Sequence, residues 1–174
     1  RVRAPWWRTP MPAPPDLFFT YMSDATPQLA TNPAKLHYLN SVHGVYLNGE
    51  SRDLGNLLPL ACLNSATALS AELHGRPYGG GILKMEPREA VNLLVPGTEV
   101  VRSLSAPLTG LLPTARRLLK AGRLSELREL VDEIVLTTDA LSADSRRHIQ
   151  EAQQSVRESR QRRRGSGRVH RRAT

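Results

Sequence analysis

The chain has 174 residues, 40% of them hydrophobic, and a formal net charge of +8, which fits one domain with or without an appendage. The charge is uneven: from Arg157 onward eight arginines face one acid, Glu158, so this tail carries +7 and residues 1–156 carry +1. The single cysteine, Cys62, excludes an internal disulfide and favours a reducing compartment. The sequence has no apolar run of about 18 residues and no signal peptide. We therefore expect a cytoplasmic protein without a membrane partner.

The first 23 residues predict two short strands around a proline-rich loop. Trp6 and Trp7 lie there between Arg3 and Arg8. Aromatic rings interleaved with arginines can stack on bases and hold phosphates. The alternative is that one tryptophan belongs to the core and its neighbour is half exposed on the opposite strand face. Packing is the commoner role of aromatic residues, so the second interpretation is favoured, and the nucleic-acid contact stays open.

Residues 36–47 predict a further strand region that ends at the tight-turn dipeptide Asn48-Gly49. His37 and His43 fall in this region, and histidines raise the question of a metal or acid–base site. No Cys, Asp or Glu stands at ligand spacing from them. Ordinary polar structure is therefore favoured over a metal site.

The central element predicted is one helix over residues 57–74. Asn56 is expected to cap its start, and Pro59 falls in the first turn, where a missing N–H costs little. Gly75 suits a left-handed C-cap. At the usual rise per residue the helix spans about 27 Å, enough to support a small sheet.

One face of this helix is predicted to be core. Apolar residues recur there at spacings of 4, 4, 3 and 4: Leu58, Cys62, Ala66, Leu69 and Leu73. Asn64 and Glu72 fall on the polar side. We therefore expect the sheet to pack on the apolar face.

The segment Arg76-Pro77-Tyr78-Gly79-Gly80-Gly81 follows the helix. Consecutive glycines are costly to order, and they allow either a sharp turn or a close approach of amide groups to phosphates. A nucleotide-binding phosphate loop is excluded because no Gly-Lys-Ser/Thr follows. Residues 82–85 alternate like an edge strand, and Pro87 sits near the start of a short helix.

The remainder is predicted to be helical, with helices over residues 113–120 and 124–136. Ser142 is expected to cap a last helix with a narrow apolar stripe: Ile149, Ala152 and Val156. Residues 157–174 are low in complexity and basic, so we expect them to be disordered when free.

Together these elements predict an α+β fold: a small mixed sheet packed on a central helix, followed by a C-terminal helical hairpin and a basic tail. The expected division is an α+β domain over residues 1–112, a helical appendage over 113–156 and the tail over 157–174.

Several stretches resemble the C-terminal, target-recognition portion of adenine-specific DNA N6-methyltransferases of restriction-modification systems. The similarity covers most of residues 1–136 and is carried by Leu63-Asn64-Ser65, Ser70-Ala71-Glu72-Leu73, the block from Tyr78 to Ala90, and Val95-Pro96, together with the upstream Trp6-Trp7-Arg8 and Asn40-Ser41-Val42-His43-Gly44. The block from the glycines to Pro96 is its most specific part.

The departure from this family is equally informative. Its enzymes bind S-adenosylmethionine and hold the flipped adenine with an Asn-Pro-Pro-Tyr or Asn-Pro-Pro-Phe tetrapeptide. The nearest segments here, Asn32-Pro33-Ala34-Lys35 and Ala13-Pro14-Pro15-Asp16, lack the amide and aromatic pair. The resemblance thus implies a non-catalytic portion, inactive alone, with no catalytic residue, cofactor or metal of its own. S-adenosylmethionine would belong to a catalytic half elsewhere.

The resulting hypothesis is a DNA-binding, target-recognition fragment whose partner is double-stranded DNA. The candidate DNA contacts are Arg3, Trp7, Arg8, Arg76, Tyr78, Gly79, Gly80, Gly81, Lys84, Arg162, Arg163 and Arg164. A protein-interaction module that docks through residues 113–156, with a generic nucleic-acid-binding tail, is the alternative. A hydrolase built on Cys62 or His43 is a distant third, because no partnered base is identifiable for either.

Overall fold

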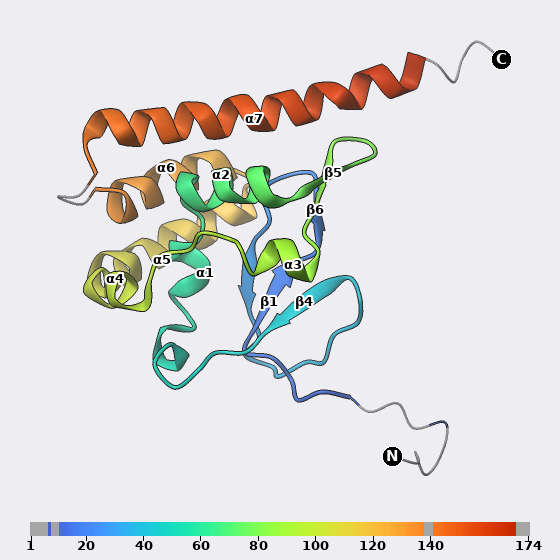
Figure 1. The fold of residues 1–174 in the computed structure, drawn as a ribbon. Helices are drawn as coiled ribbons and strands as arrows, with labels where there is room; N and C mark the ends of the chain where they lie inside the picture. The colour runs from blue at the N-terminus through green and yellow to red at the C-terminus, as the bar shows by residue number, and fades with distance from the viewer. Residues whose placement is uncertain (1–6, 8–10, 138–140, 170–174) are drawn as a thin grey trace.

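The computed structural model describes residues 7, 11–137 and 141–169, with side chains up to residue 162. It contains two three-stranded antiparallel sheets and a set of helices gathered on one side of them (Figure 1). The strands are β1 (Leu17–Thr20), β2 (Met22–Ser23), β3 (Leu29–Thr31), β4 (Val42–Val45), β5 (Arg76–Tyr78) and β6 (Ile82–Lys84). The helices are the 3-10 turn Arg52–Leu54, α1 (Leu58–Ala61), α2 (Ser65–His74), α3 (Pro87–Ala90), α4 (Thr98–Ser103), α5 (Ser105–Lys120), α6 (Leu124–Val135) and α7 (Ala143–Val169).

The two sheets are joined by one nearly continuous segment. The strand order is β3-β1-β4 in the first sheet and β2-β6-β5 in the second. Strands β1 and β2 are separated only by Tyr21, whose carbonyl accepts a hydrogen bond from the Met85 amide at 2.9 Å. The predicted strand ending at residue 23 thus exists, but it divides between two sheets.

The α+β class predicted from the sequence is confirmed. The strands form two antiparallel sheets where one mixed sheet was expected. Strand β6 pairs with both β2 and β5, so it is a central strand, whereas its alternation suggested an edge. Leu83 at its middle is fully buried, which fits the central position. No helix in the described part of the chain is long and apolar enough to cross a membrane.

The predicted helix over residues 57–74 is two helices. Helix α1 ends at Ala61, and Asn64 then caps α2 by accepting a hydrogen bond from the Thr67 amide at 2.8 Å. An asparagine side chain that accepts a hydrogen bond from the amide three residues later favours a cap over a helix interior. Asn56 makes no cap, because Leu57 occupies the N-cap position of α1.

The break also changes which face of the helix is buried. Leu73 is 65% exposed, whereas Ala68 and Ala71 are fully buried and Glu72 is only 8% exposed. Helix α7 lies along α2 (Figure 1) and covers the side that was expected to be polar. The predicted apolar face is therefore wrong for α2.

Gly75 ends α2 in an extended conformation, with φ −69° and ψ 156°, so the left-handed cap expected there is wrong. A Cβ at this position would lie 2.7 Å from the Ala71 carbonyl oxygen and 2.8 Å from the Met85 sulfur. Close packing of the helix end on β6 therefore explains the glycine.

The main core lies between the first sheet and helices α1, α4, α5 and α6. Helix α6 confirms the helix expected from residue 124. Helix α5 begins eight residues before the expected start at Pro113, which lies inside it. Proline removes the hydrogen bond to the carbonyl four residues earlier, that of Thr109. Thr109 is exposed, so water can satisfy this carbonyl.

Residues 157–169 are helical and belong to α7, where a disordered tail was expected from residue 157. The predicted Ser142 cap is confirmed, since its hydroxyl accepts a hydrogen bond from the Ser145 amide at 3.1 Å. Helix α7 runs past α6 and α2 toward the β5–β6 hairpin (Figure 1). A second, smaller core of Phe19, Ala71, Leu83 and Met85 supports that hairpin.

Asp132 of α6 connects three helices. It is 1% exposed and accepts hydrogen bonds from the Ser65 amide and hydroxyl, both at 2.6 Å, and from the Gln150 amide group at 2.8 Å. Ser65 begins α2 and Gln150 belongs to α7. A carboxylate at a helix N-terminus also interacts favourably with the helix dipole.

We predict that Asp132→Ala lowers the free energy of unfolding by about 3 kcal/mol, because it leaves several buried donors unpaired. Urea denaturation followed by circular dichroism measures this decrease. Glu133→Ala, an exposed acid at the next position of α6, is the matched control and should change stability little. Equal effects of the two substitutions would contradict the structural role of Asp132.

Candidate nucleic-acid interface

The turn between β5 and β6, part of the expected DNA-contact region, is exposed. Tyr78 is 59% exposed, and Gly79 and Gly80 are exposed as well. A Cβ on Gly79 or Gly80 would meet no atom within 4 Å. Gly80 and Gly81 have φ of +79° and +76°, in the left-handed region that favours glycine. The positive φ therefore explains why glycine occupies position 80. The turn itself faces open space.

The two basic side chains of this hairpin are already paired with carboxylates. Arg76 contacts Glu89 through Nη2 at 2.7 Å and Nε at 2.8 Å. Lys84 Nζ lies 2.6 Å from Oε1 of Glu86. A DNA phosphate would have to replace Glu89 or Glu86 to use either charge.

Lys84 is also held by two rings. Its ammonium lies 5.2 Å from the centre of the Tyr21 ring and 5.9 Å from that of Tyr78, distances typical of cation–π contacts. Hydrogen bonding to Glu86 is the main cause that raises the pKa of Lys84, and Lys84 in turn lowers the pKa of Glu86. Lys84 is therefore a permanent cation that positions Tyr78.

Arg160 of α7 joins this hairpin to the helices. Its Nε and Nη2 each lie 2.8 Å from a carboxylate oxygen of Glu72, a bidentate ion pair whose side chains are 4% and 2% exposed. Its Nη1 donates to the Gly81 carbonyl, and its Nη2 lies 3.5 Å from the Asp24 carbonyl oxygen. Gly81 is buried beneath this contact, in contrast to the exposed Gly79 and Gly80.

The remaining expected contacts divide by position. Arg162 is exposed two residues beyond Arg160, close to where α7 meets the hairpin. Trp7 is 68% exposed. The other expected contacts lie outside the described residues or side chains: Arg3, Arg8, Arg163 and Arg164. The structure thus places the helix turn that carries Arg162 next to the hairpin that carries Tyr78, Gly79 and Gly80.

The histidine and asparagine candidates have structural roles. His43 Nε2 donates to the Met85 carbonyl at 2.6 Å, and its ring contacts those of Phe19 and Tyr21. Asn32 is 4% exposed, and its amide group donates to the Pro15 and Leu36 carbonyls at 2.9 Å each. No cluster of three or more metal-ligating side chains occurs among the described residues.

Comparison with known proteins places the chain in a family. Residues 1–136 match the family described as the C-terminal domain of the Type II methyltransferase M.Eco57I. The chain belongs to this family. It is also 32% identical over 100 residues to the Type II methyltransferase M.XamI of Xanthomonas campestris pv. amaranthicola, an alignment that covers 56% of this chain and 18% of that relative. No solved structure was found to match.

The matched region of this methyltransferase C-terminal domain ends at residue 136, before α7 begins. The contacts of α7 are those that sequence reasoning missed, because Glu72 and Arg160 are 88 residues apart. In the sequence Arg160 belongs to the basic tail, and Glu72 falls on the polar side of the predicted helix. The only signal in the sequence was an acidic residue, Glu72, among the small residues of α2. Such a residue can indicate a buried charge, but it does not indicate which residue pairs with it.

We predict that Arg160→Met lowers the free energy of unfolding by about 3–5 kcal/mol, because Glu72 would remain buried without its partner. The double variant Arg160→Met with Glu72→Met should recover most of this stability, since a buried ion pair can often be replaced by apolar side chains. A double-mutant cycle in urea measures the coupling. Arg162→Met is the exposed control, and additive single effects at 160 and 72 would contradict the pairing.

Cys62 is 6% exposed, and burial raises the pKa of its thiol to about 12. The thiolate is the reactive form, so a higher pKa means a smaller reactive fraction at neutral pH. We predict that Ellman's reagent labels the folded chain at pH 8 on the order of a hundredfold more slowly than the chain in urea. Similar rates in both states would revive the hydrolase hypothesis.

Proposed function

We propose that this chain is the DNA-binding, target-recognition portion of a site-specific adenine N6 DNA methyltransferase, whose catalytic and S-adenosylmethionine-binding half lies outside it. Membership in the M.Eco57I C-terminal family supports the methyltransferase context. The adenine specificity and the recognition role follow from the resemblance of the glycine block. The chain spans 18% of the length of M.XamI, so the reaction itself is assigned to the rest of such an enzyme.

One observation carries the DNA-binding part of this proposal. Arg160 fixes α7 to the base of the β5–β6 hairpin, so an exposed aromatic turn and a strongly basic helix end lie next to each other. Bound duplex would contact both at once. Phosphate contacts orient the protein, and contacts to base edges select sequence.

The two parts would act differently. Arg162 and the arginines beyond it neutralise phosphates without reading bases. The exposed Tyr78 ring and the amides of Gly79 and Gly80 are small enough to enter a groove. In the complete enzyme, binding at this turn would help extrude the target adenine toward the catalytic half. Arg76 and Lys84 would mainly shape the hairpin, because both are paired.

A protein-interaction role has one observation in its favour, although it lies at residues 91–95 and not in residues 113–156, through which docking was expected. Val91 and Val95 are 81% and 45% exposed, and both line an apolar pocket of about 570 Å³ between the first sheet and α3. Exposed apolar residues of this kind are typical of protein contacts. Such a surface is compatible with DNA binding, because it lies on different residues.

We predict that replacing Arg162, Arg163 and Arg164 together with glutamine weakens duplex binding. The slope of log affinity against log salt should fall by about 0.9 for each phosphate that the variant no longer neutralises. Fluorescence anisotropy at several salt concentrations measures the slope. The matched control replaces three exposed cations of α5, Arg116, Arg117 and Lys120, with glutamine. Equal changes of the salt slope in the two triple variants would mean that binding depends on net charge and not on the position of these arginines.

A single substitution separates the hairpin from the helix in the same assay. Tyr78→Ala should cost about 1 kcal/mol or more of binding free energy if the ring stacks on a base, with little change in salt slope. Tyr46→Ala removes another exposed tyrosine, 51% exposed on the segment after β4, and should leave binding unchanged. If only the arginine triple has an effect, the basic helix alone binds and recognition by the turn is excluded.

A further inference from the structure

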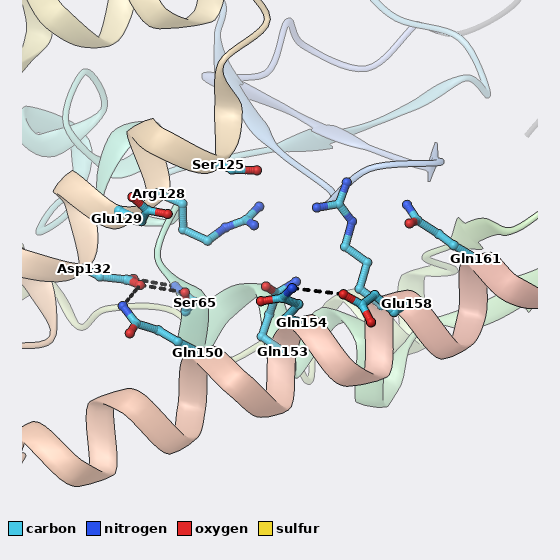
Figure 2. Close-up of a pocket in the computed structure, with 11 residues that line it drawn as sticks. Ser65, Ser125, Arg128, Glu129, Asp132, Gln150, Gln153, Gln154, Glu158 and Gln161 are labelled. Atoms are coloured by element: carbon cyan, nitrogen blue, oxygen red, sulfur yellow. Dashed lines mark hydrogen bonds between the residues drawn. The ribbon is translucent and has the colours of Figure 1, made fainter.

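A polar pocket of about 600 Å³ lies between α6 and α7, next to the first residue of α2 (Figure 2). All eleven residues that line it have polar or charged side chains. Packed helices usually meet through apolar side chains, and buried polar groups need partners. This pocket therefore requires an explanation beyond packing.

Three buried nitrogen atoms around the pocket have no hydrogen-bond partner within the described structure. They are Nε of Arg128, Nε2 of Gln153 and Nε of Arg157. Arg128 and Gln153 are each 5% exposed. Figure 2 shows the Arg128 side chain extending from α6 over the space that Gln153 faces from α7. All three unpaired atoms carry hydrogens, so the missing partner is a hydrogen-bond acceptor.

The two arginines also lack a counter-ion. Neither forms a salt bridge among the described side chains. Burial is the main cause that lowers the pKa of Arg128, and the nearby charge of Arg157 lowers it further. The carboxylates of Asp132 and Glu72 act on this pKa in the opposite direction without forming an ion pair with Arg128. Arg128 Nη2 donates to the Thr26 hydroxyl at 2.6 Å, which leaves its Nε edge available. Two like charges drawn from water at one pocket are unfavourable unless an anion lies between them.

The acids that line the pocket are occupied or lie at its rim. Asp132 accepts three hydrogen bonds from Ser65 and Gln150. Glu158 is exposed and accepts a hydrogen bond from the Gln154 amide group at 2.9 Å. Glu129 is exposed. None of them pairs with Arg128 or Arg157 among the described side chains.

We propose that this pocket binds a small oxyanion of the phosphate class, held by Arg128 from α6 and by Gln153 and Arg157 from α7. Guanidinium groups match the oxygens of phosphate in geometry and charge. The exposed carboxylates of Glu129 and Glu158 at the rim would repel a polyanion, so a free oxyanion fits better than a DNA backbone phosphate. The bound anion would join α6 to α7 and thereby strengthen the docking of α7. This proposal is independent of DNA binding.

Isothermal calorimetry and thermal unfolding of the full chain test it, with inorganic phosphate as the probe and chloride at equal ionic strength as the reference. We expect phosphate to raise Tm in a concentration-dependent way, because a ligand that binds only the folded state stabilises it. Arg157→Gln should weaken phosphate binding about tenfold or more, the effect of removing one charge-assisted hydrogen bond. Arg157 is partly exposed, so this substitution should not prevent folding.

Arg147→Gln is the matched control. It removes the same charge from an exposed position of the same helix, where Arg147 pairs with Asp144 outside the pocket, and phosphate affinity should stay unchanged. Equal Tm in phosphate and chloride, or an equal decrease in affinity in the two variants, would overturn the proposal. A short duplex could also displace phosphate, and its affinity could fall with Arg157→Gln but not with Arg147→Gln. In that case the ligand of the pocket would be a backbone phosphate and not a free anion.

Discussion

The buried ion pair between Arg160 and Glu72 determines where the basic end of the chain lies. Removing two charges from water is costly, and the cost is recovered only if both groups keep good hydrogen-bond geometry. Arg160 meets this requirement with two contacts of 2.8 Å to Glu72 and a further bond to the Gly81 carbonyl. Since each partner is expensive to leave alone, α7 has essentially one position on α2. The hairpin and the basic helix end are thereby placed together.

Polar contacts hold much of α7, in contrast to the apolar core beneath it, although Ile149 also lines an apolar pocket with Ala66 and Leu69 of α2. Helices α5 and α6 contribute fully buried leucines to the main cluster, whereas α7 faces α2 and α6 with Gln150, Gln153 and Arg160. Apolar contacts tolerate sliding better than hydrogen bonds do, because the hydrophobic effect has no direction. A polar interface therefore favours a single register of the helix. It also leaves room for the pocket, whose unpaired donors a continuous apolar interface would not have.

The sequence predicted local structure well and long-range contacts poorly. Turn residues and helix periodicity were enough for the α+β class, for α6 and for the Ser142 cap, because each depends on neighbours in the chain. The single helix predicted over residues 57–74 is wrong because the Asn64 side chain accepts a hydrogen bond from the Thr67 amide and so caps a second helix. The polarity of an asparagine by itself indicates only a position on the surface. The buried face of α2 was unpredictable, since the helix that covers it, α7, is distant in the sequence. The charged residues beyond 156 suggested disorder for the same reason. The partner of Arg160 is Glu72 of α2, which lies 88 residues earlier in the chain.

The glycine turn illustrates how one motif serves two purposes. Gly81 is buried, and its carbonyl is bonded by Arg160, so that side of the turn is fixed to the body of the protein. Gly79 and Gly80 are exposed with open space around them. A free loop of three glycines would lose much conformational entropy on binding any ligand. Because one end is already fixed and Tyr78 is held over Lys84, less of that entropy remains to be lost, and an exposed aromatic turn can bind a groove at lower cost.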